Sequence, residues 1–258
     1  LSGKKNGATV DMRDIAAPNS AVIMQITTPD GHTMNSLAAV GDIDGDGTGD
    51  FVVSDFNDTA DNGAVPGAAW LVYGVPAKQL EDGHTTVLSA ADAADATALT
   101  MPRDLSYRLG AGDSIAAVGD VNHDGRGDLV IGFDGGTIAH TTPGGIALVL
   151  GGDRTAKLTI DPTGKTRDPR VRVITGDPAG LGTGFGWAVD ALPATDAAPA
   201  LLAIGAPGAD GGNGRAYLVS SDAFTATPRA VTAIADAKAL TSAGPKARFG
   251  RSVAFVGD

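Results

Sequence analysis

Short apolar runs separated by polar turns recur along the chain. Residues 36–40 and 51–53 flank one polar loop, and residues 114–118 and 129–131 flank another. The runs consist mainly of Ala, Val, Ile, Leu and Phe and are bounded by Gly and Asp, which is typical of short β-strands. The pattern therefore predicts two hairpins, each closed by a polar loop.

Further apolar runs follow the predicted hairpins. A glycine opens a third strand at residues 67–73, 145–150 and 214–219. A fourth, outer strand is predicted at residues 96–101 and 171–174. Four short antiparallel strands per unit form a blade of a β-propeller, which buries its faces against neighbouring blades. The sequence thus predicts an all-β fold of four-stranded antiparallel blades.

The unit repeats along the chain. The Gly-Asp step before each polar loop occurs as Gly41-Asp42 and Gly119-Asp120, and again as Gly257-Asp258. Val189-Asp190 is taken as the corresponding step of the third unit. A repeat of roughly 70 residues indicates structural units that stack on one another.

The two polar loops carry oxygen-bearing side chains at matching positions. Residues 42–50 (the first loop) and 120–128 (the second loop) place them at positions 1, 3, 5 and 9, with glycine at position 6. Ca²⁺ takes about six to eight oxygen ligands, and carboxylates this close repel one another without a cation. We therefore expect Ca²⁺ in both loops, with a backbone carbonyl at position 7. The expected ligands are Asp42, Asp44, Asp46, Thr48 and Asp50 in the first loop, and Asp120, Asn122, Asp124, Arg126 and Asp128 in the second.

The loops differ from EF-hands. An EF-hand needs a bidentate Glu at position 12 and a helix on either side. Position 12 is Val53 in the first loop and Ile131 in the second, and predicted strands flank both. The ion is therefore expected to close a hairpin, in a mainly structural role.

Composition narrows the possible functions. The net charge of −11 argues against nucleic-acid binding, which needs a basic face. No apolar run is long enough to span a bilayer, so we predict no membrane insertion. The absence of cysteine leaves the compartment open. Calcium loops of this type suit the calcium concentrations outside cells, so we expect an extracellular, secreted or cell-surface protein.

The chain resembles the FG-GAP repeat family. The resemblance rests on Phe185-Gly186 opening a unit, on the acidic loop, and on Ile-Gly-Ala-Pro at residues 204–207. FG-GAP repeats build the seven-bladed β-propeller of integrin α subunits and of many secreted bacterial proteins. The resemblance implies Ca²⁺ on the loop between the first two strands of a blade, at the positions named above.

The same resemblance divides the chain into repeats. It implies repeats with calcium loops at 33–108 and 109–184, a repeat with a degenerate loop at 185–248, the end of a blade at 1–32 and the start of another at 249–258. The loop after Asp190 lacks ligands at positions 3, 5 and 9, so we expect no ion there. A seven-bladed ring needs roughly 450 residues at this period. The chain is therefore expected to be part of a longer one, or to join its end strands into a fourth blade.

Two functions fit this architecture. One is a non-catalytic adhesion or recognition module that binds a protein or carbohydrate ligand at the propeller face. The other is an accessory propeller domain of a secreted hydrolase or lyase. An enzyme site needs an acid, base or nucleophile converging on one pocket, and apart from the calcium aspartates the sequence indicates none. The prediction favours binding, with residues 54–66 and 132–143 as candidate recognition loops.

Some conspicuous residues are assigned to structure. Arg126-Gly127-Asp128 spells an integrin-recognition tripeptide, but Asp128 is committed to calcium. Ser114 lies in a Gly-Asp-Ser-Ile block that resembles an esterase nucleophile, yet no histidine stands in the context that such a nucleophile needs. His123, at position 4 of the second loop, is predicted to face solvent. The aromatic residues on predicted strands are expected to pack between blades: Trp70, Tyr73, Trp187 and Tyr217.

Overall fold

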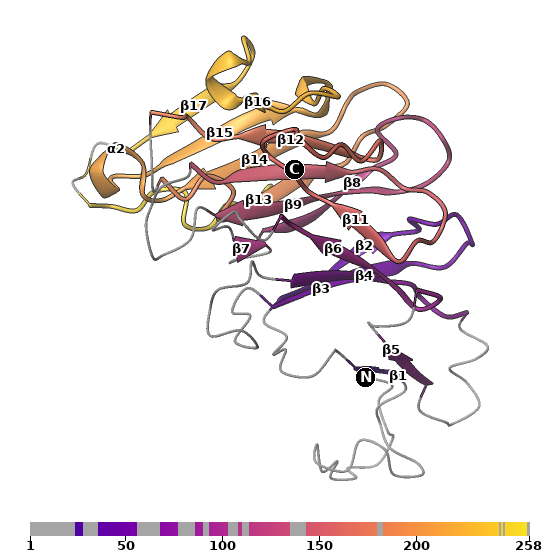
Figure 1. Ribbon diagram of the computed structural model, residues 1–258. Helices are drawn as coiled ribbons and strands as arrows, with labels where there is room; N and C mark the ends of the chain where they lie inside the picture. Colours follow the sequence, from indigo (N-terminus) through magenta and orange to yellow (C-terminus); the bar gives the residue numbers. More distant parts are fainter. Residues whose placement is uncertain are drawn as a thin grey trace, which may run out of the picture.

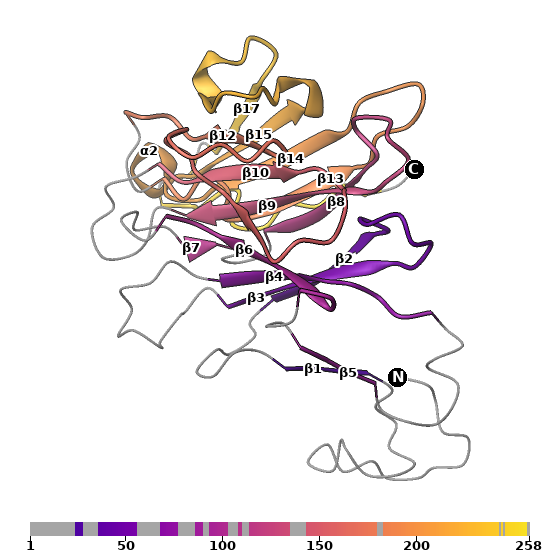
Figure 2. The same ribbon diagram turned by 45° about the vertical axis from the view of Figure 1, so that its right-hand side comes forward.

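Strands make up nearly all the regular structure of the protein (Figure 1). The computed structural model describes residues 24–27, 36–55, 68–76, 86–89, 93–102, 108–109, 114–134, 143–179, 183–242, 244 and 246–256. These form three mostly antiparallel sheets and one parallel pair of strands, which follow one another in sequence order through the molecule (Figures 1 and 2). The predicted all-β class is confirmed.

The first sheet pairs strands in the order in which they follow along the chain. It contains β2 (Ser36–Gly41), β3 (Asp50–Asp55), β4 (Ala68–Val72) and β6 (Ala96–Thr100). All three pairings among them are antiparallel. A bulge between Ala39 and Gly41 bends the end of β2 as the chain enters the first loop.

The second sheet repeats this arrangement. Its strands are β8 (Ile115–Gly119), β9 (Asp128–Asp134), β10 (Gly145–Val149) and β12 (Val171–Thr175), again antiparallel. The short β7 (Arg108–Leu109) pairs with the far end of β9. The same bulge recurs in β8, between Ala117 and Gly119. The predicted outer strands therefore exist as β6 and β12.

The third sheet has four antiparallel strands. They are β13 (Val189–Leu192), β14 (Leu201–Ala206), β15 (Arg215–Ser220) and β17 (Lys238–Thr241). Three short helical turns lie in its connections: α2 (Ala209–Gly212), η1 (Ser221–Ala223) and η2 (Val231–Ala233). All four residues of β17 are exposed, so the hydrophobic pattern does not reveal this strand.

The expected limit of four strands per sheet is wrong for the first two sheets. β11 (Lys157–Thr159) pairs in parallel with β6, and β16 (Arg229–Ala230) pairs in parallel with β12. Each added strand comes from the connection between the third and fourth strands of the next sheet. β5 (Thr86–Ser89) comes from the same connection of the first sheet and pairs in parallel with β1 (Met24–Thr27). The added strands satisfy backbone groups on an outer edge that would otherwise stay open.

Residues alternate between the two faces of the central sheet. Leu129, Ile131 and Phe133 of β9 pack in a core shared with the first sheet. Val130 of β9 and Ile146 of β10 pack in a core shared with the third sheet. This period of two places each sheet between neighbours, so burial on both faces follows from strand geometry. The aromatic prediction holds for Tyr73 and Tyr217, which are buried in cores shared between sheets. Trp70 is buried in a cluster whose described members all lie in or next to the first sheet, and Trp187 is half-buried.

The first strands of the three sheets lie beside one another, with β2 next to β8 and β8 next to β13. Glycines allow backbones of neighbouring sheets to meet. A side chain at Gly132 of β9 would collide with the carbonyl oxygen of Gly186, and one at Gly205 of β14 would collide with that of Gly250. The second sheet therefore meets the start of the third unit in the same way as the third sheet meets the segment that follows β17.

Asp190 does not hold the place of Asp42 and Asp120. It lies inside β13, where it pairs with Ala203, and its Oδ2 accepts a hydrogen bond from the Phe255 N–H (2.6 Å). Asp42 and Asp120, in contrast, come directly after β2 and β8. The equivalent connection in the third sheet is residues 193–200, between β13 and β14. Matching on a single aspartate therefore misplaces the third unit by several residues.

Candidate metal centre

The two acidic loops have the same backbone shape. Positions 4 and 6 adopt left-handed φ in both: 81° at Gly45 and 88° at Gly47 in the first, 57° at His123 and 86° at Gly125 in the second. Glycine adopts such angles freely, and histidine does so more often than most other residues. The second loop therefore keeps the same shape without a glycine at position 4. Its side chain is exposed, as predicted.

The position-1 aspartate organises each turn. The carboxylate of Asp42 accepts hydrogen bonds from the N–H groups of Gly45 (2.8 Å), Asp46 (3.0 Å) and Gly47 (2.9 Å). In the second loop, Asp120 accepts from Asp124 (3.1 Å) and Gly125 (2.8 Å). Local aspartate-to-backbone bonds of this kind fold a short chain segment back on itself.

The position-9 aspartates, Asp50 and Asp128, are buried at the base of the loops. Asp50 accepts one N–H on each carboxylate oxygen, from Ile43 and from Gly74, both at 2.8 Å. Burial raises the pKa of Asp50 to about 6, against the lowering effect of these two bonds. Each carboxylate oxygen can accept more than one hydrogen bond, so the desolvated charge has spare capacity for a cation.

Asp128 repeats this environment in the second loop. Its two oxygens accept the N–H groups of Val121 (2.8 Å) and Gly151 (2.7 Å). Burial raises the pKa of Asp128 to about 6 as well. The two loops therefore share their backbone shape and also the electrostatic state of their deepest carboxylate.

Three of the expected first-loop ligands converge. Asp42, Asp44 and Asp50 each present an oxygen atom, and these atoms lie within 4.8 Å of one another. An all-oxygen set with this charge fits a hard cation such as Ca²⁺ better than a softer metal. Asp46 is not in this group; its Oδ1 accepts the Thr48 N–H (2.7 Å) and its Oδ2 accepts a hydrogen bond from Arg154 (2.8 Å). Thr48, at position 7, has a half-buried side chain.

The remaining second-loop residues are arranged slightly differently. Asn122 donates its side-chain N–H to Asp124 Oδ2 (2.9 Å), so positions 3 and 5 bond directly to each other. Both side chains are exposed. Arg126, at position 7, directs its guanidinium out of the loop to Asp153 (2.9 Å). The oxygen-bearing residues are present in this loop too, with an amide in place of one carboxylate, but Asp120, Asp124 and Asp128 do not converge as the three first-loop aspartates do.

Sequence reasoning missed Arg154. It lies 108 residues after Asp46, and its Nε donates to Asp44 (2.5 Å) while its Nη2 donates to Asp46. No local spacing predicts such a contact, because it depends on how the second sheet docks on the first. The sequence signal that could have pointed to this contact is a basic residue shortly after the third strand of the following repeat.

The two residues assigned to structure rather than function fit that assignment. Asp128 of the Arg-Gly-Asp tripeptide has no exposed surface, so a receptor cannot reach it. Ser114 is also fully buried, and its Oγ has no hydrogen-bond partner within the described residues. A serine that has no solvent access, and no base bonded to its hydroxyl within the described part of the chain, is not arranged to act as a nucleophile.

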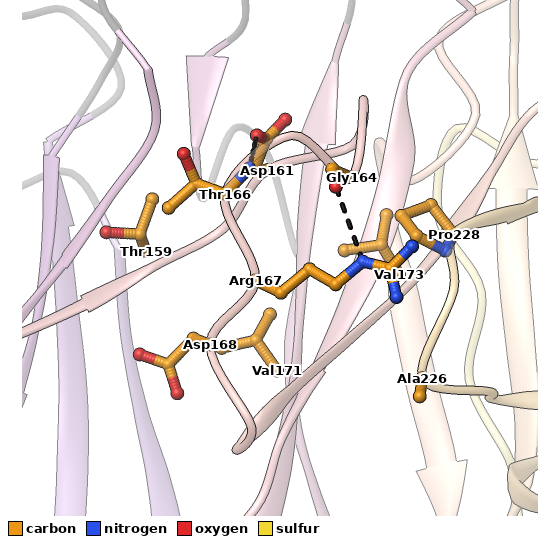
Figure 3. A pocket seen from close by; sticks show the side chains of 10 residues that line it. All are labelled: Thr159, Asp161, Gly164, Thr166, Arg167, Asp168, Val171, Val173, Ala226 and Pro228. Atoms are coloured by element: carbon orange, nitrogen blue, oxygen red, sulfur yellow. Dashed lines mark hydrogen bonds between the residues drawn. The ribbon is translucent and has the colours of Figure 1, made fainter.

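A crevice lies where the β11–β12 connection meets residues 226–228 (Figure 3). Burial alone would raise the pKa of Asp161, but hydrogen bonds from Thr163 and Thr166 hold it below its ordinary value. Arg167 reaches back to the Gly164 carbonyl (3.4 Å). The charged groups of this crevice are therefore occupied in stabilising a turn.

A more open cleft borders the second loop. It lies between that loop, residues 194–199 and η1. Its polar lining includes His123, Thr195, Asp196 and Asp222. Two aspartates and one histidine thus line a cleft that is open to solvent.

Comparison with known proteins agrees with the repeat structure. Residues 111–150 match the model of the FG-GAP repeat. The match spans β8, the second loop, β9 and β10, so it includes one whole candidate metal loop. A search of curated proteins found no match. The chain thus carries an FG-GAP repeat within an all-β fold. In the described part of the chain, no helix has the length and apolar character needed to cross a bilayer.

Proposed function

We propose that this chain is a calcium-binding β-propeller module that acts outside the cell in adhesion or recognition, without catalysis of its own. The observation that carries the proposal is the first loop, in which three aspartate side chains converge, together with a second loop of the same backbone shape that is likewise built on a buried aspartate. Asp42, Asp44 and Asp50 bring their oxygen atoms within 4.8 Å of one another. A divalent cation would offset the mutual repulsion of these carboxylates.

Packing supports the propeller. Neighbouring first strands and shared two-sided cores are what radially tiled blades require, and the FG-GAP match agrees with that arrangement. Membership of a seven-bladed ring is part of the same proposal. In such a ring, calcium at the loops would hold the first hairpin of each blade closed.

The open cleft beside the second loop is the best-supported recognition surface. His123, Thr195, Asp196 and Asp222 offer hydrogen-bond donors and acceptors on a rigid frame. A protein or carbohydrate ligand would use such polar groups. The candidate recognition loops at 54–66 and 132–143 lie mostly outside the described residues. The crevice of Figure 3 does not favour catalysis, since Asp161 is bonded within its own turn.

Calorimetric titration with Ca²⁺ tests the proposal. The wild-type chain should bind two ions, and Asp46→Ala and Asp124→Ala should each abolish one. Asp177→Ala, which removes a carboxylate outside both loops, should leave two. At about 100 times the dissociation constant, each site should stabilise the fold by about 2.7 kcal/mol, so a chelator should lower the melting temperature by several degrees. An unchanged melting curve would rule out the structural role.

A further inference from the structure

Arg154 lies between two sheets. It follows β10, yet its guanidinium rests on the first loop of the preceding sheet. Nε donates to Asp44 Oδ2 (2.5 Å), Nη2 to Asp46 Oδ2 (2.8 Å) and Nη1 to the Ala94 carbonyl (2.8 Å). The guanidinium carbon lies 4.5 Å from the centre of the Tyr73 ring. The Asp44 side chain is 5% exposed, so this charge pair is shielded from water on the Asp44 side.

In the second loop, positions 3 and 5 do not need a cationic side chain from another part of the chain to offset repulsion between carboxylates. Its position 3 is Asn122, whose amide N–H bonds directly to Asp124 Oδ2 (2.9 Å). The first loop has Asp44 at that position, and therefore one more carboxylate than the second. Arg154 binds this additional carboxylate. Repulsion between positions 3 and 5 is thus offset by the Arg154 guanidinium in the first loop, and is avoided in the second by the amide of Asn122.

The contact has a consequence for any ion that enters the first loop. Arg154 holds Asp44 and Asp46, each by Oδ2, and of these two only Asp44 belongs to the converging group with Asp42 and Asp50. A calcium ion in this loop needs position 5 as a ligand. It would also meet the positive charge of the guanidinium at close range, where like charges repel.

We propose that Arg154 is a tethered competitor of Ca²⁺ at the first loop. It neutralises Asp44 and Asp46 when the ion is absent and releases Asp46 when the ion binds. The inference rests on the proposed calcium function. It makes the first loop the weaker of the two sites. It also couples that site to the joint between sheets, because the nearby Gly152 N–H donates to the Ile43 carbonyl of the first loop (2.9 Å).

The test is a calcium titration of the full chain in an Asp124→Ala background, so that only the first loop is read. Adding Arg154→Gln should tighten binding at least tenfold, because it removes the competing charge and leaves Asp44 and Asp46 unpaired. Arg172→Gln is the matched control: it removes the same charge from β12, where the guanidinium donates to the Pro169 carbonyl (2.7 Å), and should leave the affinity unchanged.

In chelator, Arg154→Gln should melt below wild type. In excess Ca²⁺ its melting temperature should rise further than that of wild type.

Each outcome decides the matter. Weaker Ca²⁺ binding by Arg154→Gln would overturn the inference, since Arg154 would then hold Asp44 and Asp46 in place for the ion. Unchanged affinity would also overturn it, and a lower melting temperature in chelator would then mark Arg154 as a structural contact only. Absence of binding in wild type and in every variant would reject the calcium function itself. If wild type instead binds two ions and Arg154→Gln does not change the affinity of the first loop, only the inference about Arg154 fails.

Discussion

Asp50 and Asp128 are the loop carboxylates whose charge is most costly to the folded protein. Both are buried, and burial raises the pKa of each from 3.8 to about 6. Without metal, the protonated form therefore favours folding. That contribution is fully present below pH 4 and is lost as the pH rises to about 6. Calcium acts in the opposite direction, because it binds the ionised carboxylate and offsets the cost of its charge.

This linkage gives a pH prediction. Below pH 6, each Ca²⁺ that binds must displace one proton from Asp50 or Asp128, so the affinity of each site should fall about tenfold per pH unit. Titrations at pH 5 in two buffers of different ionisation enthalpy should reveal proton release, and the same pair at pH 8 should reveal none. An affinity that stays flat between pH 5 and pH 7 would contradict the raised pKa of these carboxylates.

Residue-level prediction from sequence succeeds where the determinants are local. The turn-forming contacts of Asp42 span at most five residues, so regular spacing exposes them. Arg154 meets Asp46 across 108 residues, and only docking of the sheets brings the two together. Asp190 shows the reverse error, since an aspartate that matches in sequence lies inside a strand when the pairing is known.

At the scale of elements, the parallel outer strands are the feature that the sequence concealed. The four antiparallel strands of the first two sheets follow from alternation and glycine-led turns. β11 has three residues and β16 has two, too few for a period of two to be recognised. Their positions depend on a free edge offered by the preceding sheet, which is a tertiary property. The first two sheets are therefore each completed by the repeat that follows.

Truncating a side chain on β11 tests this completion. Leu158 is 3% exposed, pairs with Leu99 of β6 and packs in the core shared by the first two sheets. Leu158→Ala should lower the free energy of unfolding by about 2–4 kcal/mol, through lost apolar burial and the cavity left behind. Lys157→Ala, at an exposed position of the same strand, should change it by less than about 0.5 kcal/mol. Urea denaturation measures both, and equal effects would mean that β11 is not part of the packed structure.

At the scale of the whole molecule, stability is shared between neighbouring sheets. The central sheet contributes β9 side chains to two cores, with Ile131 on one face and Val130 on the other. A sheet that is buried on both faces cannot be removed without exposing two neighbours. This mutual dependence is typical of repeat architectures, whose stability resides in the joints between units.

Phe185 and Phe249 offer a paired test of that dependence. Each forms an isolated parallel bridge to a glycine, Gly144 or Gly214, so they hold equivalent places in successive units. Phe185 is 1% exposed and stacks edge-on against Tyr217 at 5.3 Å, whereas Phe249 is 39% exposed. Phe185→Ala should therefore cost about 3–5 kcal/mol, the range for a buried aromatic side chain.

Phe249→Ala should cost about 1 kcal/mol, because the ring keeps much of its contact with water in the folded state. Urea denaturation of both variants, in chelator so that calcium does not mask the difference, gives the two free energies directly. Equal losses would mean that Phe249 is covered in solution by a surface that the described residues do not include. A small loss at Phe185 would instead mean that the second and third sheets are not packed against each other. That result would remove the basis for tiling these sheets around a common axis.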